Sequence, residues 1–188
     1  MSAESGVPTK VERTALELLA RHEITTLPID PVSIARAEGI RTLFEHLPHD
    51  TSSVLLREPS GRRTIAVNKT HSDTRQRFSV AHEIGHAFLH FNGHAPSVSE
   101  AAVSRPLEVL FRDGLAGTGT DTKEIEANAF AATLLMPSER VTFAFRERLN
   151  ASPKLRTDVL IKELASEFGV SPQAMRFRLM NLGVVDPA

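Results

Sequence analysis

Arg77-Phe-Ser-Val-Ala-His-Glu-Ile-Gly-His-Ala-Phe-Leu-His90 contains the pattern H-E-x-x-H, and its apolar residues recur with the spacing of a helix. In a helix, residues four apart lie on the same face, so His82 and His86 can direct their ring nitrogens to one point. Two imidazoles so placed fit two corners of a zinc tetrahedron. Glu83 lies about 100° further around the helix, where it is poorly directed to bind the ion but can reach a water held by it. The segment therefore predicts a metallohydrolase site in which Glu83 is the general base.

The same pattern also occurs by chance on ordinary amphipathic helices, where both histidines are bonded to backbone groups or face solvent. Here the flanking residues predict a helix that is mostly buried, and these are Phe78, Ala81, Gly85, Phe88 and Leu89. Two stacked histidines in such a helix need partners, because an unpaired buried polar group costs free energy. The flanks therefore favour the metal site over a chance match.

His90 continues the series as a third histidine, four residues after His86. A straight helix rises 1.5 Å per residue and carries His90 about 12 Å from His82, which is too far for both to bind one ion. We therefore interpret His90 as a structural or pocket-lining residue at the end of the helix.

The composition is that of a globular protein, and it excludes several kinds of site. Hydrophobic residues make up 41% and charged residues 24% of the 188 residues, which suits one compact domain with at most a small appendage. The net charge of −1 gives no general attraction to nucleic acids or membranes. Cysteine is absent, so a metal site must use histidine and carboxylate ligands. Tyrosine is also absent, so histidine or arginine must stabilise any oxyanion.

Targeting signals are missing from the sequence. The segment from Met1 to Lys10 has no apolar signal core, and eighteen consecutive apolar residues occur nowhere in the chain. We therefore expect a cytoplasmic protein that has no membrane partner.

Two helices are predicted at the N-terminal end. Apolar residues at helical spacing indicate an amphipathic helix between Val7 and His22. Asp30 followed by Pro31 is typical of a helix N-terminus, and Gly39 ends the resulting short helix after Ala37. These segments carry no chemistry, and we interpret them as a scaffold that covers a sheet.

Alternation of apolar and polar residues predicts three strands, at Ile40–Phe44, Ser53–Arg57 and Thr64–Asn68. The short connections between them favour a small antiparallel sheet or meander. The histidine helix follows at once, capped by Ser72 or Asp73, and is the natural partner of this sheet. A groove between an edge strand and the metal would accept an extended peptide by strand addition.

Phe91 to Thr122 is less regular and contains several glycines and prolines. We interpret it as a long loop with a short helix near Ser99 and a strand-like segment from Leu107 to Arg112. A loop of this length often borders a functional site. It can equally be an excursion without a role, and the sequence leaves both interpretations open.

A third ligand is expected from the helix Thr122–Met136, which ends at Pro137. At about 100° per residue, Glu124 falls on the buried stripe of this helix and Glu126 on its polar side. A buried carboxylate needs a positive partner, which is either the metal or a buried arginine, and we favour the metal. Asn128 lies one turn after Glu124, well placed to hydrogen-bond a ligating histidine. Small residues on this helix allow close approach to the histidine helix, and these are Ala127, Ala131 and Ala132.

Two blocks of sequence, Arg75-Gln-Arg-Phe-Ser-Val-Ala-His-Glu-Ile-Gly-His86 and Glu124-Ile-Glu-Ala-Asn-Ala-Phe-Ala-Ala-Thr-Leu-Leu-Met-Pro137, resemble the ImmA/IrrE family of zinc metallopeptidases. The likeness extends upstream to Ile65-Ala-Val-Asn68 and downstream to the C-terminal helices. It implies a gluzincin-like zinc site. It also implies cleavage of helix-turn-helix repressors in bacteria, phages or mobile elements, often under stress or within a regulatory pair.

The resemblance also implies roles for individual residues. His82 and His86 would be zinc ligands and Glu83 the base. Glu124 would be the third ligand, with Glu126 as the alternative. The segment between the two blocks matches no motif of the family, so the resemblance says nothing about the substrate groove there.

The C-terminal segment from Asp158 to Gly183 resembles a helix-turn-helix, since Phe168-Gly-Val-Ser171 separates two helical patterns and Pro172 opens the second. One interpretation is DNA contact, through the residues Gln173, Arg176 and Arg178. The other is a packed helical hairpin or a docking surface for a repressor. From Glu139 onward eight Lys and Arg stand against six Asp and Glu, which is too small an excess for many phosphate contacts. We therefore favour the packed hairpin.

Taken together, the sequence predicts an α+β zinc-dependent endopeptidase. We expect a metallopeptidase-like domain at residues 1–138 and a helix-turn-helix-like segment at residues 139–188 that packs on it. The expected cofactor is Zn²⁺ and the expected partner is a helix-turn-helix repressor, with DNA binding possible but not favoured.

The residue that stabilises the oxyanion is left open. Four residues are candidates that the sequence does not rank, and these are His71, His90, His94 and Arg112. The competing predictions are a zinc-fold regulator that binds without cutting and a metal-free helical scaffold. The oligomeric state is not predicted.

Overall fold

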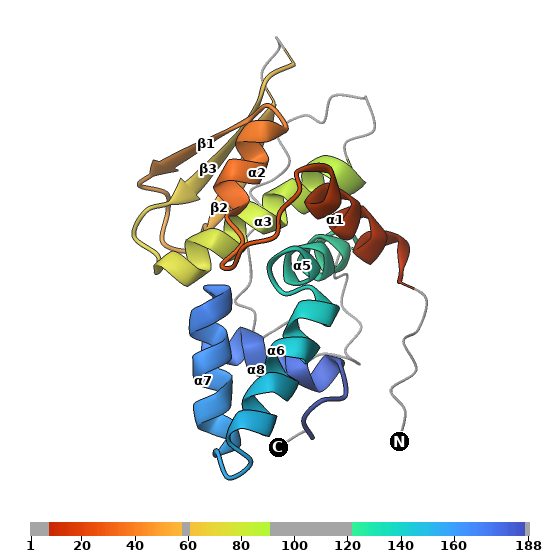
Figure 1. Ribbon diagram of the computed structural model, residues 1–188. Coiled ribbons are helices and arrows are strands. Elements are labelled where there is room, and N and C mark those ends of the chain that lie inside the picture. Colours follow the sequence, from red (N-terminus) through yellow and green to blue (C-terminus); the bar gives the residue numbers. More distant parts are fainter. Residues whose placement is uncertain (1–7, 58–60, 91–121, 187–188) are drawn as a thin grey trace.

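The computed structural model describes residues 8–57, 61–90 and 122–186, which form an α+β fold (Figure 1). Its strands are β1 (Ile40–Glu45), β2 (Ser53–Arg57) and β3 (Arg63–Asn68). Its helices are α1 (Lys10–Arg21), α2 (Pro31–Ala37), α3 (Asp73–Leu89), α5 (Thr122–Leu135), α6 (Ser138–Ala151), α7 (Thr157–Phe168) and α8 (Pro172–Asn181). None of the helices in these ranges has the length and apolar character that crossing a membrane requires.

Capping residues define the two N-terminal helices. α1 begins after Thr9, whose side chain accepts a hydrogen bond from the backbone of Glu12 at 3.2 Å while the Glu12 carboxylate accepts from the backbone of Thr9 at 2.8 Å. The Asp30 carboxylate accepts from the backbone of Val32 at 3.0 Å, and this confirms the predicted start of α2. The short helix ends before Gly39, whose φ of +70° is a conformation that favours glycine.

The three strands lie where the alternation predicts them, but the sheet is not an antiparallel meander. Its order is β1-β3-β2, with β1 parallel and β2 antiparallel to β3. The alternating pattern reveals that strands exist but not which one is central. β3 is the central strand, and residues on both of its faces are buried, namely Thr64, Ile65, Val67 and Asn68.

Asn68 holds the connection between β1 and β2 against the end of β3. Its Nδ2 donates to the carbonyl oxygens of Leu47 and Pro48 at 3.2 Å each and of Thr51 at 3.0 Å. Its Oδ1 accepts from the backbone of Thr70 at 3.1 Å. A single fully buried amide thus fixes the segment that returns the chain to β2 and the turn that leads into α3.

α3 lies between the sheet and α5, and it contacts both (Figure 1). Its close contact with α5 depends on Gly85, because a Cβ at this position would lie 3.1 Å from the Cα and the carbonyl oxygen of Ala127. Backbone atoms cannot yield as a flexible side chain can. The absence of a side chain at Gly85 and the small side chains of α5 therefore set the distance between these two helices.

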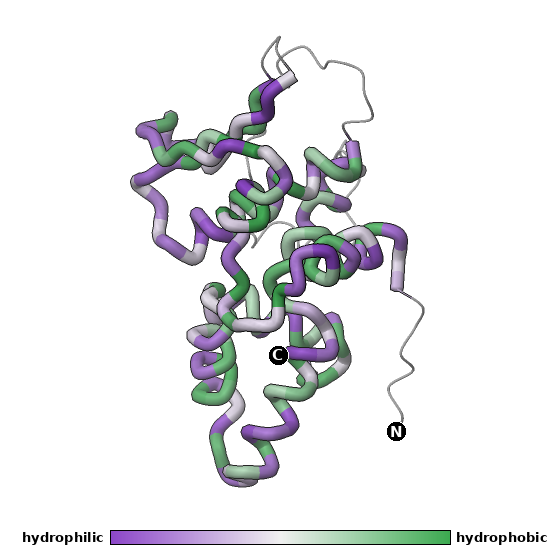
Figure 2. Tube along the Cα trace, turned by 45° about the horizontal axis from the view of Figure 1, so that its top comes forward, coloured by the Kyte–Doolittle hydropathy of each residue, from purple (hydrophilic) through white to green (hydrophobic). Residues whose placement is uncertain are grey.

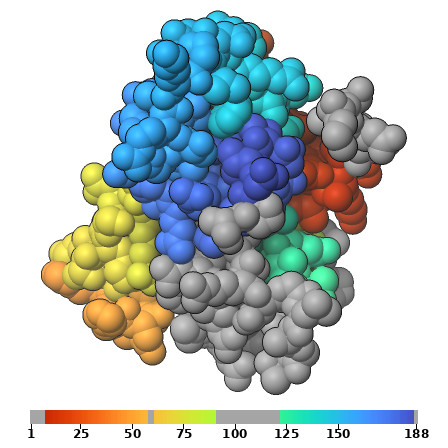
Figure 3. Space-filling view, turned by 90° about the horizontal axis from the view of Figure 1, so that it is seen from below, coloured from red at the N-terminus to blue at the C-terminus, as the bar shows by residue number. Residues whose placement is uncertain are grey.

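The C-terminal helices pack on the rest of the chain and share one hydrophobic core with it. Figure 2 shows hydrophobic residues alternating with hydrophilic ones along these helices. Arg77 on α3 donates to the carbonyl of Gly169 at 2.9 Å, and Arg178 on α8 donates to the carbonyl of Met136 at 2.9 Å. Gly169 ends α7 with a φ of +63°, and Ser171 caps α8 by accepting from the backbone of Ala174 at 3.1 Å. Figure 3 shows α6, α7 and α8 gathered on one face.

Candidate metal centre

α3 carries the H-E-x-x-H residues in its buried half. His82 is 3% and Glu83 is 2% exposed, and both neighbours of this pair, Ala81 and Ile84, are fully buried. The flanking aromatic residues Phe78 and Phe88 pack against the core from partly buried positions. The predicted burial of this helix is therefore confirmed, and its polar groups need partners inside the protein.

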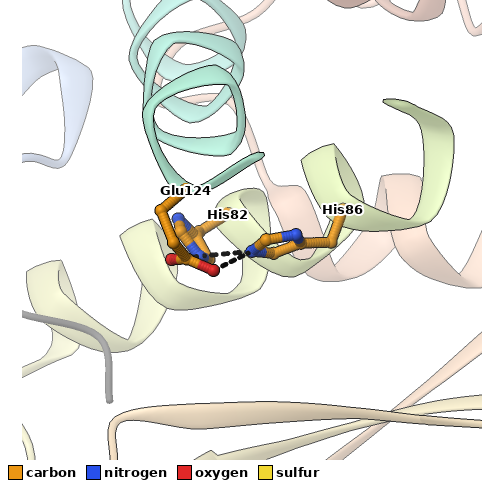
Figure 4. Close-up of side chains that lie close together, drawn as sticks. All are labelled: His82, His86 and Glu124. Atoms are coloured by element: carbon orange, nitrogen blue, oxygen red, sulfur yellow. Dashed lines mark hydrogen bonds and ion pairs between the residues drawn. The ribbon is translucent and has the colours of Figure 1, made fainter. Parts of the chain in front are cut away.

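Three side chains from α3 and α5 converge, and these are His82, His86 and Glu124 (Figure 4). Nε2 of His82 lies 2.9 Å from Nε2 of His86. The two carboxylate oxygens of Glu124 lie 3.2 Å from His82 Nε2 and 3.1 Å from His86 Nε2. In a tetrahedral zinc site with bonds of about 2.0 Å, ligand atoms are about 3.3 Å apart, so these separations fit one shared ion.

Asn128 determines which nitrogen of His82 faces this point. Asn128 Nδ2 donates to the backbone carbonyl of Glu124 at 2.7 Å, so its Oδ1 is the atom 3.1 Å from His82 Nδ1. Because an amide oxygen only accepts, Nδ1 of His82 carries the proton and Nε2 of the neutral ring carries a lone pair. That lone pair points at a carboxylate and at a second imidazole, and a cation between them would satisfy all three groups.

The charges around the site also favour a cation. Burial would raise the pKa of Glu124, but hydrogen bonds that His82 and His86 donate when a proton occupies Nε2 in place of a metal ion outweigh it and hold the pKa well below its usual range. Burial would lower the pKa of His82, but the hydrogen bond of its protonated ring with Glu124 and the charge of Glu83 raise it overall. Two carboxylates therefore surround the histidines, and they would stabilise a bound cation.

Glu83 does not join the three converging groups, and its carboxylate is held from the sheet. Ser53 Oγ on β2 donates to Glu83 Oε1 at 2.8 Å, and the Ser53 side chain is fully buried. Sequence reasoning did not single out Ser53. The available signal was weak, since a serine that begins a predicted strand usually bonds to the local backbone or to solvent.

His90 and Glu126 form a second pair beside the three converging groups. His90 Nε2 lies 2.9 Å from Glu126 Oε2, and His90 Nδ1 lies 3.1 Å from Nδ1 of His86. Sequence reasoning offered Glu126 as an alternative ligand, but its carboxylate contacts His90 instead. Both ring nitrogens of His90 have partners, so this residue has no free donor for an oxyanion.

The other predicted residues lie away from this cluster or outside the described residues. Burial and the charge of Arg75 lower the pKa of His71, whose buried Nδ1 has no hydrogen-bond partner among the described residues. Arg178 is 8% exposed, so it is not available to contact DNA, whereas Gln173 is exposed and Arg176 partly so. The remaining predictions lie outside the described residues, namely His94, Arg112, the short helix near Ser99, the strand-like segment from Leu107 to Arg112, and the predicted loop from Phe91 to Thr122 except for Thr122 itself, which begins α5.

Comparisons with known proteins give matches in sequence and in fold. The family model Peptidase_M78, described as an IrrE N-terminal-like domain, matches residues 35–180. A curated relative is the "Uncharacterized immunity region protein 2" of Bacillus phage phi105, which is 25% identical over 137 residues that cover 73% of this chain and 75% of the relative.

A solved structure of a Mycobacterium tuberculosis transcriptional regulator has a similar fold, with a TM-score of 0.57 and 18% sequence identity. The similarity covers 91% of this chain, but this chain spans only 46% of that longer protein. At this identity the likeness concerns the fold alone.

Proposed function

The chain belongs to the IrrE N-terminal-like family, Peptidase_M78, and from this premise we propose that it is a zinc-dependent endopeptidase that cleaves a helix-turn-helix repressor or a similar protein. The observation that carries the proposal is the convergence of His82, His86 and Glu124 beside the buried carboxylate of Glu83. This donor set of two imidazoles and one carboxylate is typical of catalytic zinc sites, which leave one position for water.

In the proposed mechanism His82, His86 and Glu124 hold Zn²⁺, which when bound makes water acidic and polarises the scissile carbonyl. Glu83 accepts a proton from the attacking water and later donates it to the amine nitrogen of the leaving group. Ser53 holds one oxygen of the Glu83 carboxylate, so the other oxygen is available for proton transfer. Asn128 keeps Nε2 of His82 unprotonated and directed at the ion.

The substrate would bind as an extended strand along β2. β2 pairs with β3 on one side, and no described strand pairs with its other edge. Ser53, the first residue of β2, touches Glu83, so the strand leads directly to the proposed base. A peptide that adds to this edge through backbone hydrogen bonds would pass the reacting groups in a defined register.

A repressor is the partner that the comparisons support best. The phage relative is named an immunity region protein, and the resemblance to the ImmA/IrrE family implies a helix-turn-helix repressor as the substrate. A repressor target would place the reaction in the cytoplasm. We also propose that residues 1–138 form the peptidase domain and that residues 139–188 form a helical segment packed on it, through contacts such as the one between Arg178 and Met136.

The test is incubation of the purified, zinc-loaded protein with candidate helix-turn-helix repressors, beginning with any that is encoded beside this gene, followed by mass spectrometry of the products. Glu83→Gln should retain stoichiometric zinc and lose cleavage, because glutamine cannot act as the base. A variant that still cuts would contradict the mechanism. A regulator that only binds would inactivate the repressor equally well as Glu83→Gln, and a metal-free scaffold would contain no zinc by elemental analysis.

A further inference from the structure

Three side chains form a hydrogen-bonded row that leads away from the proposed metal site, in the order His86, His90 and Glu126. The two Nδ1 atoms of the histidines lie 3.1 Å apart, and His90 Nε2 lies 2.9 Å from Glu126 Oε2. The His86 and His90 side chains are 12% and 9% exposed, and that of Glu126 is 42% exposed. The row therefore begins inside the protein and ends at a carboxylate in contact with water.

The order of donors and acceptors in this row follows from its carboxylate end. An ionised carboxylate only accepts, so His90 Nε2 carries a proton and donates it to Glu126. The Nδ1 atom of the neutral His90 ring then has a lone pair, and His86 Nδ1 must be the donor to it. Consequently, Nε2 of His86 has no proton and presents a lone pair to Glu124 and His82, where a metal ion would lie.

We propose that His90 and Glu126 are positioning residues for the zinc ligand His86. His90 fixes the tautomer and the ring orientation of His86, and Glu126 in turn fixes the tautomer of His90. The inference rests on the proposed zinc site and assigns a role to two residues that the reaction itself does not use. A hydrogen-bond acceptor behind a ligating histidine orients the ring and makes its free nitrogen a better ligand.

The geometry also shows that His90 is not a ligand itself. His90 faces Nδ1 of His86, whereas Glu124 and His82 face Nε2 on the other side of the same ring. His86 therefore separates His90 from the point where the three ligands converge. The role differs from that of Asn128, which supports His82 directly with one amide.

The experiment measures the zinc affinity of the full chain by competition with a chromophoric chelator. His90→Ala should weaken zinc binding by about 10-fold to 100-fold, which is typical when the partner of a ligating histidine is removed. His90→Gln should recover part of this loss, because its side-chain carbonyl can accept from His86 Nδ1. Glu126→Ala should have a smaller effect, since its carboxylate is partly exposed. Glu147→Ala, which removes an exposed carboxylate from α6, is the matched control and should bind zinc normally.

A second measurement detects the tautomer directly. In the zinc-loaded protein labelled with ¹⁵N-histidine, the Nδ1 proton of His86 should give an NMR signal that exchanges slowly with water. His90→Ala and Glu126→Ala should accelerate this exchange, an effect that a merely structural role of His90 would not produce. Should His90→Ala fail to fold, Glu126→Ala and the NMR signal decide the matter.

The outcomes separate this inference from the proposed function. Native affinity in His90→Ala, together with loss of zinc in His82→Ala, would overturn the positioning role and leave the zinc site intact. An unchanged His86 signal in Glu126→Ala would also overturn it. A native protein that binds no zinc would overturn the proposed function and this inference together.

Discussion

The helix pair α3 and α5 and the helix pair α7 and α8 both carry a recognisable motif, but they use their polar side chains differently. On α3, His82 and His86 turn their Nε2 atoms away from their own helix and meet Glu124 of α5. On α8, Arg178 turns into the protein and donates to the carbonyl of Met136. The first arrangement leaves lone pairs directed at a common point, and the second satisfies a backbone group.

This difference shows what distinguishes a site from a fold contact. Buried polar groups that satisfy one another stabilise the fold and need nothing else. Buried acceptors that face one another repel unless a cation or proton lies between them. The α3 and α5 cluster is of the second kind, so a proton or a metal ion must lie between its groups, whereas Arg178 on α8 has a backbone partner.

The largest expected effect is loss of the third ligand. Glu124→Ala should abolish stoichiometric zinc binding, because two histidines alone are fewer than the three protein ligands of a catalytic zinc site. Elemental analysis after dialysis measures the loss. Lys123→Ala, an exposed neighbour on α5, is the control and should keep its zinc. Full zinc content in Glu124→Ala would mean that another residue completes the site.

The distance between α3 and α5 depends on the missing side chain at Gly85. In Gly85→Ala the new Cβ would lie 3.1 Å from two backbone atoms of Ala127 and from Phe130. Overpacking costs about 1–3 kcal/mol, and the better helix propensity of alanine offsets about 1 kcal/mol of that. We expect lower stability in urea unfolding and zinc binding weakened by about 10-fold, because Glu124 moves with α5.

Either measurement can contradict this prediction. Unchanged stability would mean that α5 shifts without cost. Unchanged zinc affinity would mean that Glu124 reaches the histidines whatever the spacing of the helices. Both results would weaken the view that a close contact at Gly85 prepares the site.

The sequence predicted the local part of this structure well. Asp30 and Pro31 opened α2 as expected, and the face of Glu124 was found from helical angles alone, although its role as a ligand stays a prediction. Such features depend on residues within one or two turns of each other, and helical geometry is nearly constant. The contact between Asn128 and His82 followed from the same geometry, once both helices were assumed to meet at the histidines.

Features that depend on distant residues were not predictable. The parallel pairing of β1 with β3 requires knowing which strand is central, and alternation is the same for an edge strand and its neighbour. Ser53 reaches Glu83 across 30 positions, and His90 reaches Glu126 across 36. Helical angles placed Glu126 on the polar side, where a long side chain can still reach a histidine at the end of α3.

Ser53 holds the carboxylate of Glu83 by a hydrogen bond. Ser53→Ala should lower kcat by about 10-fold, as expected when the partner of a catalytic group is removed, while zinc content and KM stay unchanged. Ser53→Thr keeps the hydroxyl and should restore much of the rate. If Ser53→Ala instead lost zinc, Ser53 would support the fold of the site rather than the orientation of Glu83.

The smallest effect is expected at α8. The helix-turn-helix interpretation predicts that this helix contacts DNA, whereas the packed-hairpin interpretation predicts that it only stabilises the fold. Arg178→Ala removes the donor to Met136, but it also removes a buried Nη2 that has no hydrogen-bond partner among the described residues. The two changes partly cancel, so the free energy of unfolding should fall by only about 1 kcal/mol, with zinc affinity unchanged. Arg176 on the same helix is partly exposed, so Arg176→Ala should change the free energy of unfolding by about 0.5 kcal/mol or less.

A helix that binds DNA would behave differently, because Arg176→Ala would then reduce retention on duplex DNA without affecting stability. That result would show that α8 is an interaction surface despite its buried Arg178, and the contrast with α3 would have to be abandoned.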